Sequence, residues 1–137
     1  MVELVLKYVE LVLHIDKDLF CYIIDLMTSE QPEIQALALR FVSQGISAEQ
    51  TNLTELALKR GVLTKFQLLL NSINPIIVKE TLWGLSNFAA ENAAYTHALL
   101  SEEVLLDRVM KLLTNSSKDI RTEALFVIAN ISETASP

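Results

Sequence analysis

Apolar side chains recur every three or four residues along most of this chain, which is the spacing of an amphipathic α-helix. Polar breakers such as Asn71-Ser72 separate the apolar stretches. Pro32 and Pro75 stand where a helix accepts proline, in its first turn. After residue 15 the pattern predicts helices near 18–27, 32–46, 50–59, 61–70, 75–89, 92–101, 104–113 and 118–132.

The pattern repeats itself along the chain. Three segments align without gaps at an offset of 43 residues: EIQALALRFVSQGI from Glu33, IIVKETLWGLSNFA from Ile76 and DIRTEALFVIANIS from Asp119. The same offset aligns DLFCYIIDLMT from Asp18, GVLTKFQLLLN from Gly61 and VLLDRVMKLLT from Val104. Two separate blocks that keep one spacing indicate an internal repeat.

A helical repeat of this length is typical of armadillo and HEAT solenoids. One short and two longer helices in each repeat favour the armadillo unit over the two-helix HEAT unit. We therefore expect an all-α, armadillo-type α-solenoid of about three repeats that winds into a right-handed superhelix. Residues 1–137 are expected to form a single domain, with repeat units at roughly 6–48, 49–91 and 92–134, and to be a fragment of a longer solenoid.

Composition narrows the function classes. With 17 acidic and 11 basic residues the net charge is −6, which argues against nucleic acid as a partner. The apolar start, MVELVLKYVELVLHI, is interrupted by charges and too short to cross a membrane, so we expect a helix of a soluble protein. Cys21 is the only cysteine, and no GxSxG, HExxH or phosphate-loop motif occurs. We expect no enzyme activity, no metal and no cofactor.

The long third helix of each repeat has two different stripes. The apolar stripe is expected to be core and contains Ile77, Thr81, Leu82, Leu85, Phe88 and Ala89, then Ile120, Ala124, Ile128 and Ile131. The second stripe combines an acid, an aromatic ring and an amide: Glu80, Trp83 and Asn87, then Glu123, Phe126 and Asn130. Because third helices of neighbouring repeats stack side by side, the second stripes are expected to line one shared surface.

The segment KETLWGLSNFAAEN resembles the third armadillo helix of importin-α, the nuclear import adaptor. The resemblance implies a concave groove in which Asn87 grips the backbone of an extended basic peptide and Trp83 packs against lysine stems. Asn130 matches the family's asparagine, whereas Phe126 stands where tryptophan is usual. Glu91 follows Asn87 by four residues, where the family's larger site can place an acid against a lysine.

The first repeat departs further from this family, because Arg40 replaces the tryptophan and Gln44 replaces the asparagine. In importin-α a repeat with arginine at this place precedes the two tryptophan repeats of the minor groove site. The resemblance thus implies a peptide-binding adaptor for nuclear import, located in cytoplasm and nucleus. Its partner is expected to be a Lys/Arg-rich segment of a cargo protein.

Each of these residues also has a structural interpretation. Trp83 can be a packing residue, and Asn87 and Asn130 can bond to the backbone of the preceding repeat. Arg40 can be the partner of a nearby acid. The chain would then be a structural or self-associating scaffold without peptide binding.

The acids of the second stripe have alternatives too. Glu80 and Glu123 can pair with neighbouring bases such as Lys79. Glu91 can serve as the starting residue of the next short helix.

The ends of the solenoid make a separate prediction. The outer side of the last helix, around Leu125, Ile128 and Ile131, has no following repeat in this sequence to cover it. The N-terminal helix is apolar on several sides. Exposed apolar ends associate, so we expect a homo-oligomer formed through the solenoid ends.

Overall fold

The computed structural model describes residues 17–47 and 51–135, and all of its regular structure in these residues is helical. In chain order the helices are α2 (Lys17–Leu26), α3 (Pro32–Ser47), α4 (Thr51–Lys59), α5 (Val62–Leu69), α6 (Pro75–Glu91), α7 (Ala93–Leu100), α8 (Glu103–Leu112) and α9 (Lys118–Ala135). The all-α prediction is confirmed. The predicted N-terminal helix lies outside the described residues.

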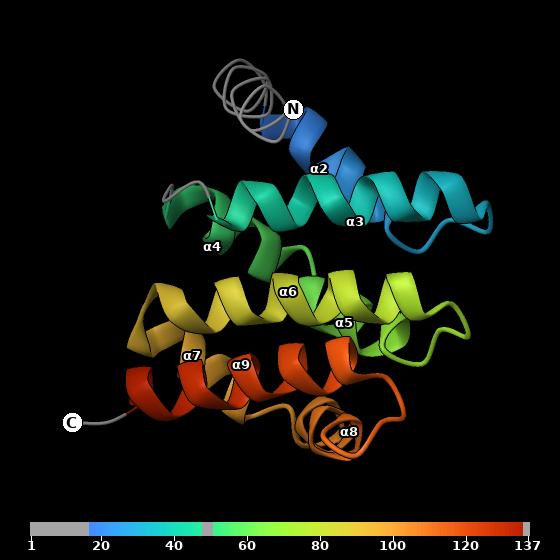
Figure 1. The fold of residues 1–137 in the computed structure, drawn as a ribbon. Coiled ribbons are helices and arrows are strands. Elements are labelled where there is room, and N and C mark those ends of the chain that lie inside the picture. Colours follow the sequence, from blue (N-terminus) through green and yellow to red (C-terminus); the bar gives the residue numbers. More distant parts are fainter. Residues whose placement is uncertain (1–16, 48–50, 136–137) are drawn as a thin grey trace.

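The three longest helices form successive layers of one stack (Figure 1). Helices α3, α6 and α9 begin at residues 32, 75 and 118, which reproduces the sequence period. Helix α6 lies in the middle and packs against both α3 and α9, while α5 packs against α8 behind them. This is the arrangement of an armadillo-type solenoid, as the repeat predicts.

Local sequence explains where α6 begins and ends. Asn74 caps its start, because the Asn74 side chain accepts a hydrogen bond from the Ile76 amide at 3.0 Å and Pro75 occupies the first turn. At the other end, Asn92 adopts an extended backbone and accepts a hydrogen bond from the Tyr95 amide at 3.0 Å. Asn92 therefore caps α7, and Glu91 is the last residue of α6.

The predicted core stripe of α6 is buried throughout. Its side chains are Ile77, Thr81, Leu82, Leu85, Phe88 and Ala89. Each large apolar side chain buried in this way contributes about 1.5–3 kcal/mol relative to exposure. In α9 the equivalent Ile120, Ala124 and Ile131 are buried and Ile128 is half-buried.

The glycine of α6 allows α3 to approach closely. A Cβ atom added to Gly84 would stand 2.5 Å from the Ser43 Oγ and 3.1 Å from the Phe66 ring. Phe66 is fully buried, so its ring has little room to move. Any side chain at residue 84 would therefore push α3 and α6 apart.

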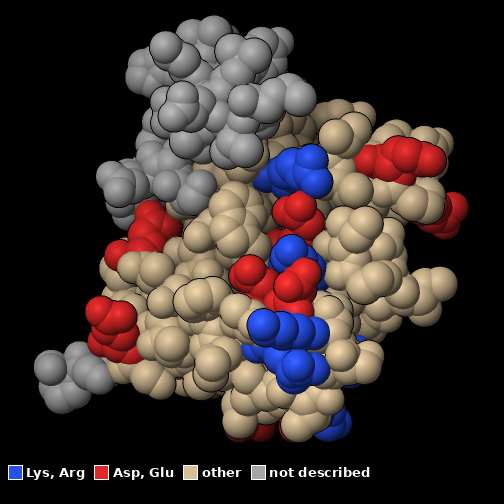
Figure 2. All heavy atoms as spheres, in the orientation of Figure 1, with Lys and Arg blue, Asp and Glu red and all other residues tan. Residues whose placement is uncertain are grey.

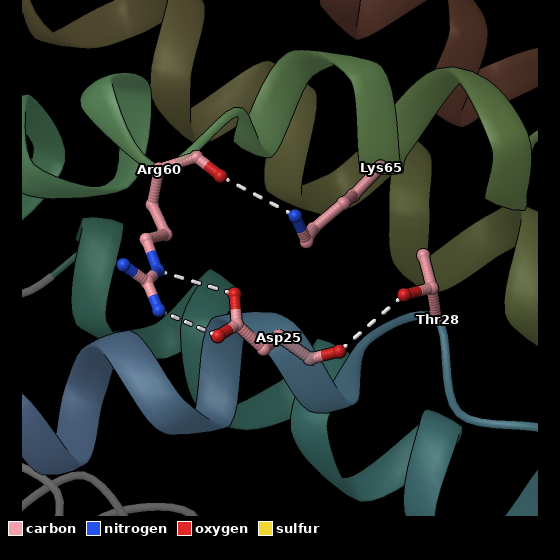
Figure 3. A network of polar contacts seen from close by, with 4 residues as sticks. All are labelled: Asp25, Thr28, Arg60 and Lys65. Carbon is pink, nitrogen blue, oxygen red and sulfur yellow. Dashed lines mark hydrogen bonds and ion pairs between the residues drawn. The ribbon is translucent and has the colours of Figure 1, made fainter.

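An ion pair joins the first and second repeats on the side away from these long helices (Figure 3). The Arg60 guanidinium donates to both carboxylate oxygens of Asp25, at 3.2 and 2.7 Å. Lys65 donates to the Arg60 carbonyl and Thr28 to the Asp25 carbonyl. The hydrogen bond from Arg60 lowers the pKa of the Asp25 carboxyl.

One part of the prediction for the C-terminal end is wrong. Leu125 is exposed as expected, but Ile131 is only 8% exposed. Ile131 occupies the repeat position of Phe88, which is buried and packs its ring against Tyr95. That column points into the core, and α9 packs against α7. The outer side of α9 therefore consists of Leu125 and Ile128 without Ile131.

Candidate functional site

The second stripe of α6 stays partly accessible along the length of the helix. Glu80, Trp83, Asn87 and Glu91 are all half-buried, whereas the core stripe of the same helix is buried. These four residues follow one another at helical spacing along a single line.

The other predicted site residues lie at the same repeat positions of α9 and α3. On α9, Glu123 and Asn130 are half-buried and Phe126 is 53% exposed. On α3, Arg40 is exposed and Gln44 is buried. We call the surface formed by Arg40, Gln44, Glu80, Trp83, Asn87, Glu91, Glu123, Phe126 and Asn130 the third-helix face.

Charges on the third-helix face are paired between repeats. Arg40 of α3 donates to Glu80 of α6 at 3.1 Å, and Lys79 of α6 lies 3.7 Å from Asp119 of α9. Figure 2 shows basic and acidic side chains alternating in a column across this side of the molecule. Glu80 is thus paired with a base, but with Arg40 of the preceding repeat instead of a sequence neighbour. Such exposed pairs are worth at most about 1 kcal/mol, so a ligand can displace them.

The two asparagines of the face are used differently. The Asn130 Nδ2 donates to the Ser86 carbonyl at 3.0 Å, which ties α9 to α6. This is the bond to the preceding repeat that the structural interpretation expects. The Asn87 Nδ2 is buried and has no hydrogen-bond partner among the described residues. A buried amide donor without a partner costs about 1–3 kcal/mol.

Glu91 extends the set of buried groups that lack a partner. Neither of its carboxylate oxygens makes a hydrogen bond within the described part of the chain. Burial raises the pKa of the Glu91 carboxyl, and the nearby Thr54 hydroxyl offsets part of the rise. The Thr54 Oγ1 is itself buried and does not reach hydrogen-bond geometry with any described group. The pKa of Tyr95 is raised by burial and then by the charges of Glu91 and Glu55, which places Glu91 in a region already rich in negative charge.

Thr54 is the site residue that the sequence analysis missed. Thr54 lies on the short helix α4 and its side chain is fully buried, as is typical of a core residue. No column of the repeat alignment carries a hydroxyl there, since His97 holds the equivalent place one period later. Helix α4 packs against α2, α3 and α5, and this packing places Thr54 near Glu91.

Other kinds of site find no support in residues 17–47 and 51–135. No group of three or more His, Cys, Asp and Glu side chains is placed to hold a metal ion. No helix there has the length and apolar character needed to cross a bilayer.

The fold of this chain is similar to that of solved armadillo repeat structures. No family model and no curated protein matches the chain. Among solved structures, a designed armadillo repeat protein matches with a TM-score of 0.73 and 24% identity, over 81% of this chain and 46% of its own. Another, in complex with the peptide (KR)4, matches with a TM-score of 0.76 and 20% identity, over 85% of this chain and 51% of its own. An engineered protein matches with a TM-score of 0.76 and 24% identity, over 82% of this chain and 45% of its own. The chain therefore has the armadillo fold and spans about half the length of these structures.

Proposed function

We propose that this protein is a non-catalytic peptide-binding adaptor that holds a basic, extended segment on the third-helix face. The observation that carries the proposal is the set of buried groups without partners at the end of α6. The Asn87 amide, the Glu91 carboxylate and the Thr54 hydroxyl all lack hydrogen bonds to described residues. Groups left in this state inside a folded protein call for an explanation, and a ligand that satisfies them supplies one.

The chemistry of these groups matches a lysine residue in an extended chain. A lysine ammonium has three donors and no acceptor, so the Glu91 carboxylate and the Thr54 hydroxyl can both accept from it. The lysine ammonium neutralises the Glu91 carboxylate, whose charge is costly to bury without a partner. The Asn87 Nδ2 donates to a main-chain carbonyl of the same peptide. The lysine stem then packs on Trp83, where each buried methylene contributes about 0.8 kcal/mol.

The solved structures support this class of ligand. One designed armadillo repeat protein of the same fold is in complex with the peptide (KR)4, an alternating Lys/Arg chain. The resemblance of KETLWGLSNFAAEN to importin-α points in the same direction. From that resemblance we propose a role in nuclear protein import, with cargo segments as partners and the cytoplasm and nucleus as location.

The arrangement predicts weak binding by this chain alone. Among the described residues of the third-helix face, only those of α6 combine a ring, an amide without a partner and a half-buried acid, because the Asn130 amide already bonds to Ser86. One such position supports a Kd of about 1 μM or weaker. Multivalency explains why longer arrays gain affinity without any change in the individual site.

Calorimetric titration with (KR)4 and with an acidic peptide of the same length tests the proposal. We expect saturable binding of the basic peptide alone, and a loss of about tenfold or more in Asn87→Ala and Glu91→Gln. Glu103→Gln is the matched control, because Glu103 is an exposed acid on α8 outside the third-helix face. Equal affinity of all three variants, or binding of both peptides alike, would overturn the proposal.

A structural scaffold is the second candidate function. The Asn130–Ser86 hydrogen bond and the Arg40–Glu80 ion pair favour it, since both use groups of the third-helix face to hold repeats together. Absence of any heat of binding at millimolar (KR)4 and low salt would leave this candidate in place.

A further inference from the structure

A cavity opens between the second and third repeats, at the end of the stack where the long helices begin. It measures about 450 Å³ and is walled by the α5–α6 loop, the α8–α9 loop and side chains of α6, α8 and α9. In Figure 1 both loops lie at the right-hand end of the stack. None of the residues that line the cavity belongs to the third-helix face, so this is a separate place on the molecule.

The charged group in the wall of this cavity is the Arg108 guanidinium. Its Nε donates to the Leu70 carbonyl at 3.3 Å, which leaves the edge formed by the two Nη groups for another acceptor. Arg108 takes part in none of the ion pairs among residues 17–47 and 51–135. Asp107, its neighbour in the sequence, is paired with Lys111 at 3.0 Å. The described part of the chain therefore supplies no counter-ion for this guanidinium.

The polar side chains that line the same cavity also offer donors. The Ser72 Oγ accepts from the Asn74 amide at 3.1 Å. The Ser117 Oγ accepts from the Ile120 amide at 3.4 Å. Each hydroxyl keeps its proton to donate. The Asn115 Oδ1 accepts from the Ser117 amide at 2.9 Å, which leaves the Nδ2 group as a donor. No carboxylate is among the described residues that line the cavity, so its wall suits an anionic acceptor.

A second guanidinium makes the surroundings of the cavity more positive. Arg121 donates to the Asn115 and Ser116 carbonyls at 2.9 and 3.2 Å, which fixes its charge at the α8–α9 loop. The acid closest to this loop on α9 is Asp119, which lies 3.7 Å from Lys79 and is thus already paired. This part of the surface therefore attracts anions although the whole chain has a net charge of −6.

The rest of the wall is apolar. Val78, Leu112 and Ile120 line the cavity and are buried, whereas Ile73 and Pro75 line it from exposed positions. A bare inorganic ion would leave these side chains uncovered, whereas an anion with an apolar body covers them and meets the donors as well. A volume of about 450 Å³ falls within the range of small-molecule sites.

We propose that this cavity binds an organic carboxylate. The carboxylate takes the open edge of the Arg108 guanidinium in two parallel hydrogen bonds, and the apolar body of the ligand covers the buried part of the wall. One guanidinium balances the single negative charge of a carboxylate, whereas a phosphate group carries more charge than it can balance. Two sources share this chemistry, namely the C-terminal residue of a peptide and a free carboxylic acid.

Titrations followed by the backbone amide signals in nuclear magnetic resonance test the proposal. The probes are N-acetyl-leucine, N-acetyl-leucine amide, hexanoate and acetate. The Ser72 and Ser117 signals are expected to shift and saturate with N-acetyl-leucine at a Kd of about 1 mM. The uncharged amide and the short acetate are each expected to bind at least about tenfold more weakly. Tighter binding of N-acetyl-leucine than of hexanoate identifies a peptide C-terminus as the source, and the reverse order identifies a free acid.

A pair of variants on α8 tests the role of the guanidinium. Arg108→Gln is expected to weaken the binding of N-acetyl-leucine by at least about tenfold. Lys111→Gln is the matched control, because Lys111 is an exposed cation on the same helix outside the cavity and should leave the affinity unchanged. Circular dichroism confirms that both variants keep the helical fold.

Three results would overturn the proposal. They are signals that stay in place up to about 50 mM N-acetyl-leucine, equal affinity for N-acetyl-leucine and its amide, and unchanged affinity in a folded Arg108→Gln. The comparison of acid and amide uses the original protein, so it decides the question even where the variant does not fold.

Discussion

The Glu91 carboxylate is expected to lower the stability of the free protein. Its two oxygens are buried without hydrogen bonds to described residues, and burial raises its pKa. A buried polar group left without a partner costs about 1–3 kcal/mol. Glutamine removes the charge but keeps a polar group at this place, and Glu91 is only half-buried, so Glu91→Gln is expected to stabilise the free protein by about 1 kcal/mol at pH 7. In a domain of this size that raises the melting temperature by about 3–5 °C.

The pH dependence of this effect follows from the direction of the pKa change. Below the unfolded pKa of about 4.3 the carboxyl is protonated in both states and the variant gains nothing. As the pH rises, the unfolded chain ionises first, and the folded protein loses stability until the pH exceeds the raised folded pKa. The advantage of Glu91→Gln therefore appears above pH 4 and is complete once the pH exceeds the raised pKa of Glu91 in the folded protein.

Thermal unfolding of the original protein and of Glu91→Gln between pH 3 and 8 measures this difference. Glu103→Gln, an exposed acid on α8, should stay within about 0.5 kcal/mol of the original protein at every pH. Addition of (KR)4 at pH 7 should raise the melting temperature of the original protein more than that of Glu91→Gln. A melting temperature that falls in Glu91→Gln, or rises equally at pH 3 and pH 7, would refute the reasoning.

Three further predictions concern the stack itself. Gly84→Ala is expected to destabilise the fold by up to about 2 kcal/mol, because overpacking against the Ser43 hydroxyl exceeds the gain in helix propensity, and Ser43→Ala should restore most of the loss in urea unfolding. Asn130→Ala should cost about 1 kcal/mol through loss of its bond to α6, without weakening (KR)4 binding as Asn87→Ala does; equal loss of binding would contradict the division of roles. Asp25→Asn should lower the urea midpoint at pH 7, since Arg60 lowers the pKa of Asp25 and the stabilisation is lost as pH falls below 3.8; a difference that persists in strong acid would argue against this pair.

Much of the fold follows from the sequence because the repeat provides several independent copies of the same signal. The predicted ranges of the long helices agree with α3, α6 and α9, and the core stripe of α6 is buried as the helical spacing requires. Pro32 and Pro75 fix the helix starts through a local constraint that does not depend on packing. Ile131 is expected both in the core stripe and on the outer side of the last helix, and its burial confirms the first and contradicts the second.

The details of the candidate site depend on distances that sequence spacing does not determine. Asn87 and Asn130 occupy the same column, yet only Asn130 reaches a backbone carbonyl. Arg40 and Glu80 pair across 40 residues of sequence, in agreement with one of the interpretations left open. Thr54 lies near Glu91 without a hydrogen bond between them, and no pattern in the repeat indicates this proximity.

Nuclear magnetic resonance of the side-chain amides tests the central claim most directly. In a titration with (KR)4, the Asn87 amide and the Trp83 indole signals should shift together and saturate, while the Asn130 amide, held by Ser86, should barely move. Signals of Asn87 and Trp83 that stay in place at saturating peptide, or shifts spread evenly over the exposed acids, would contradict a built peptide site on this face.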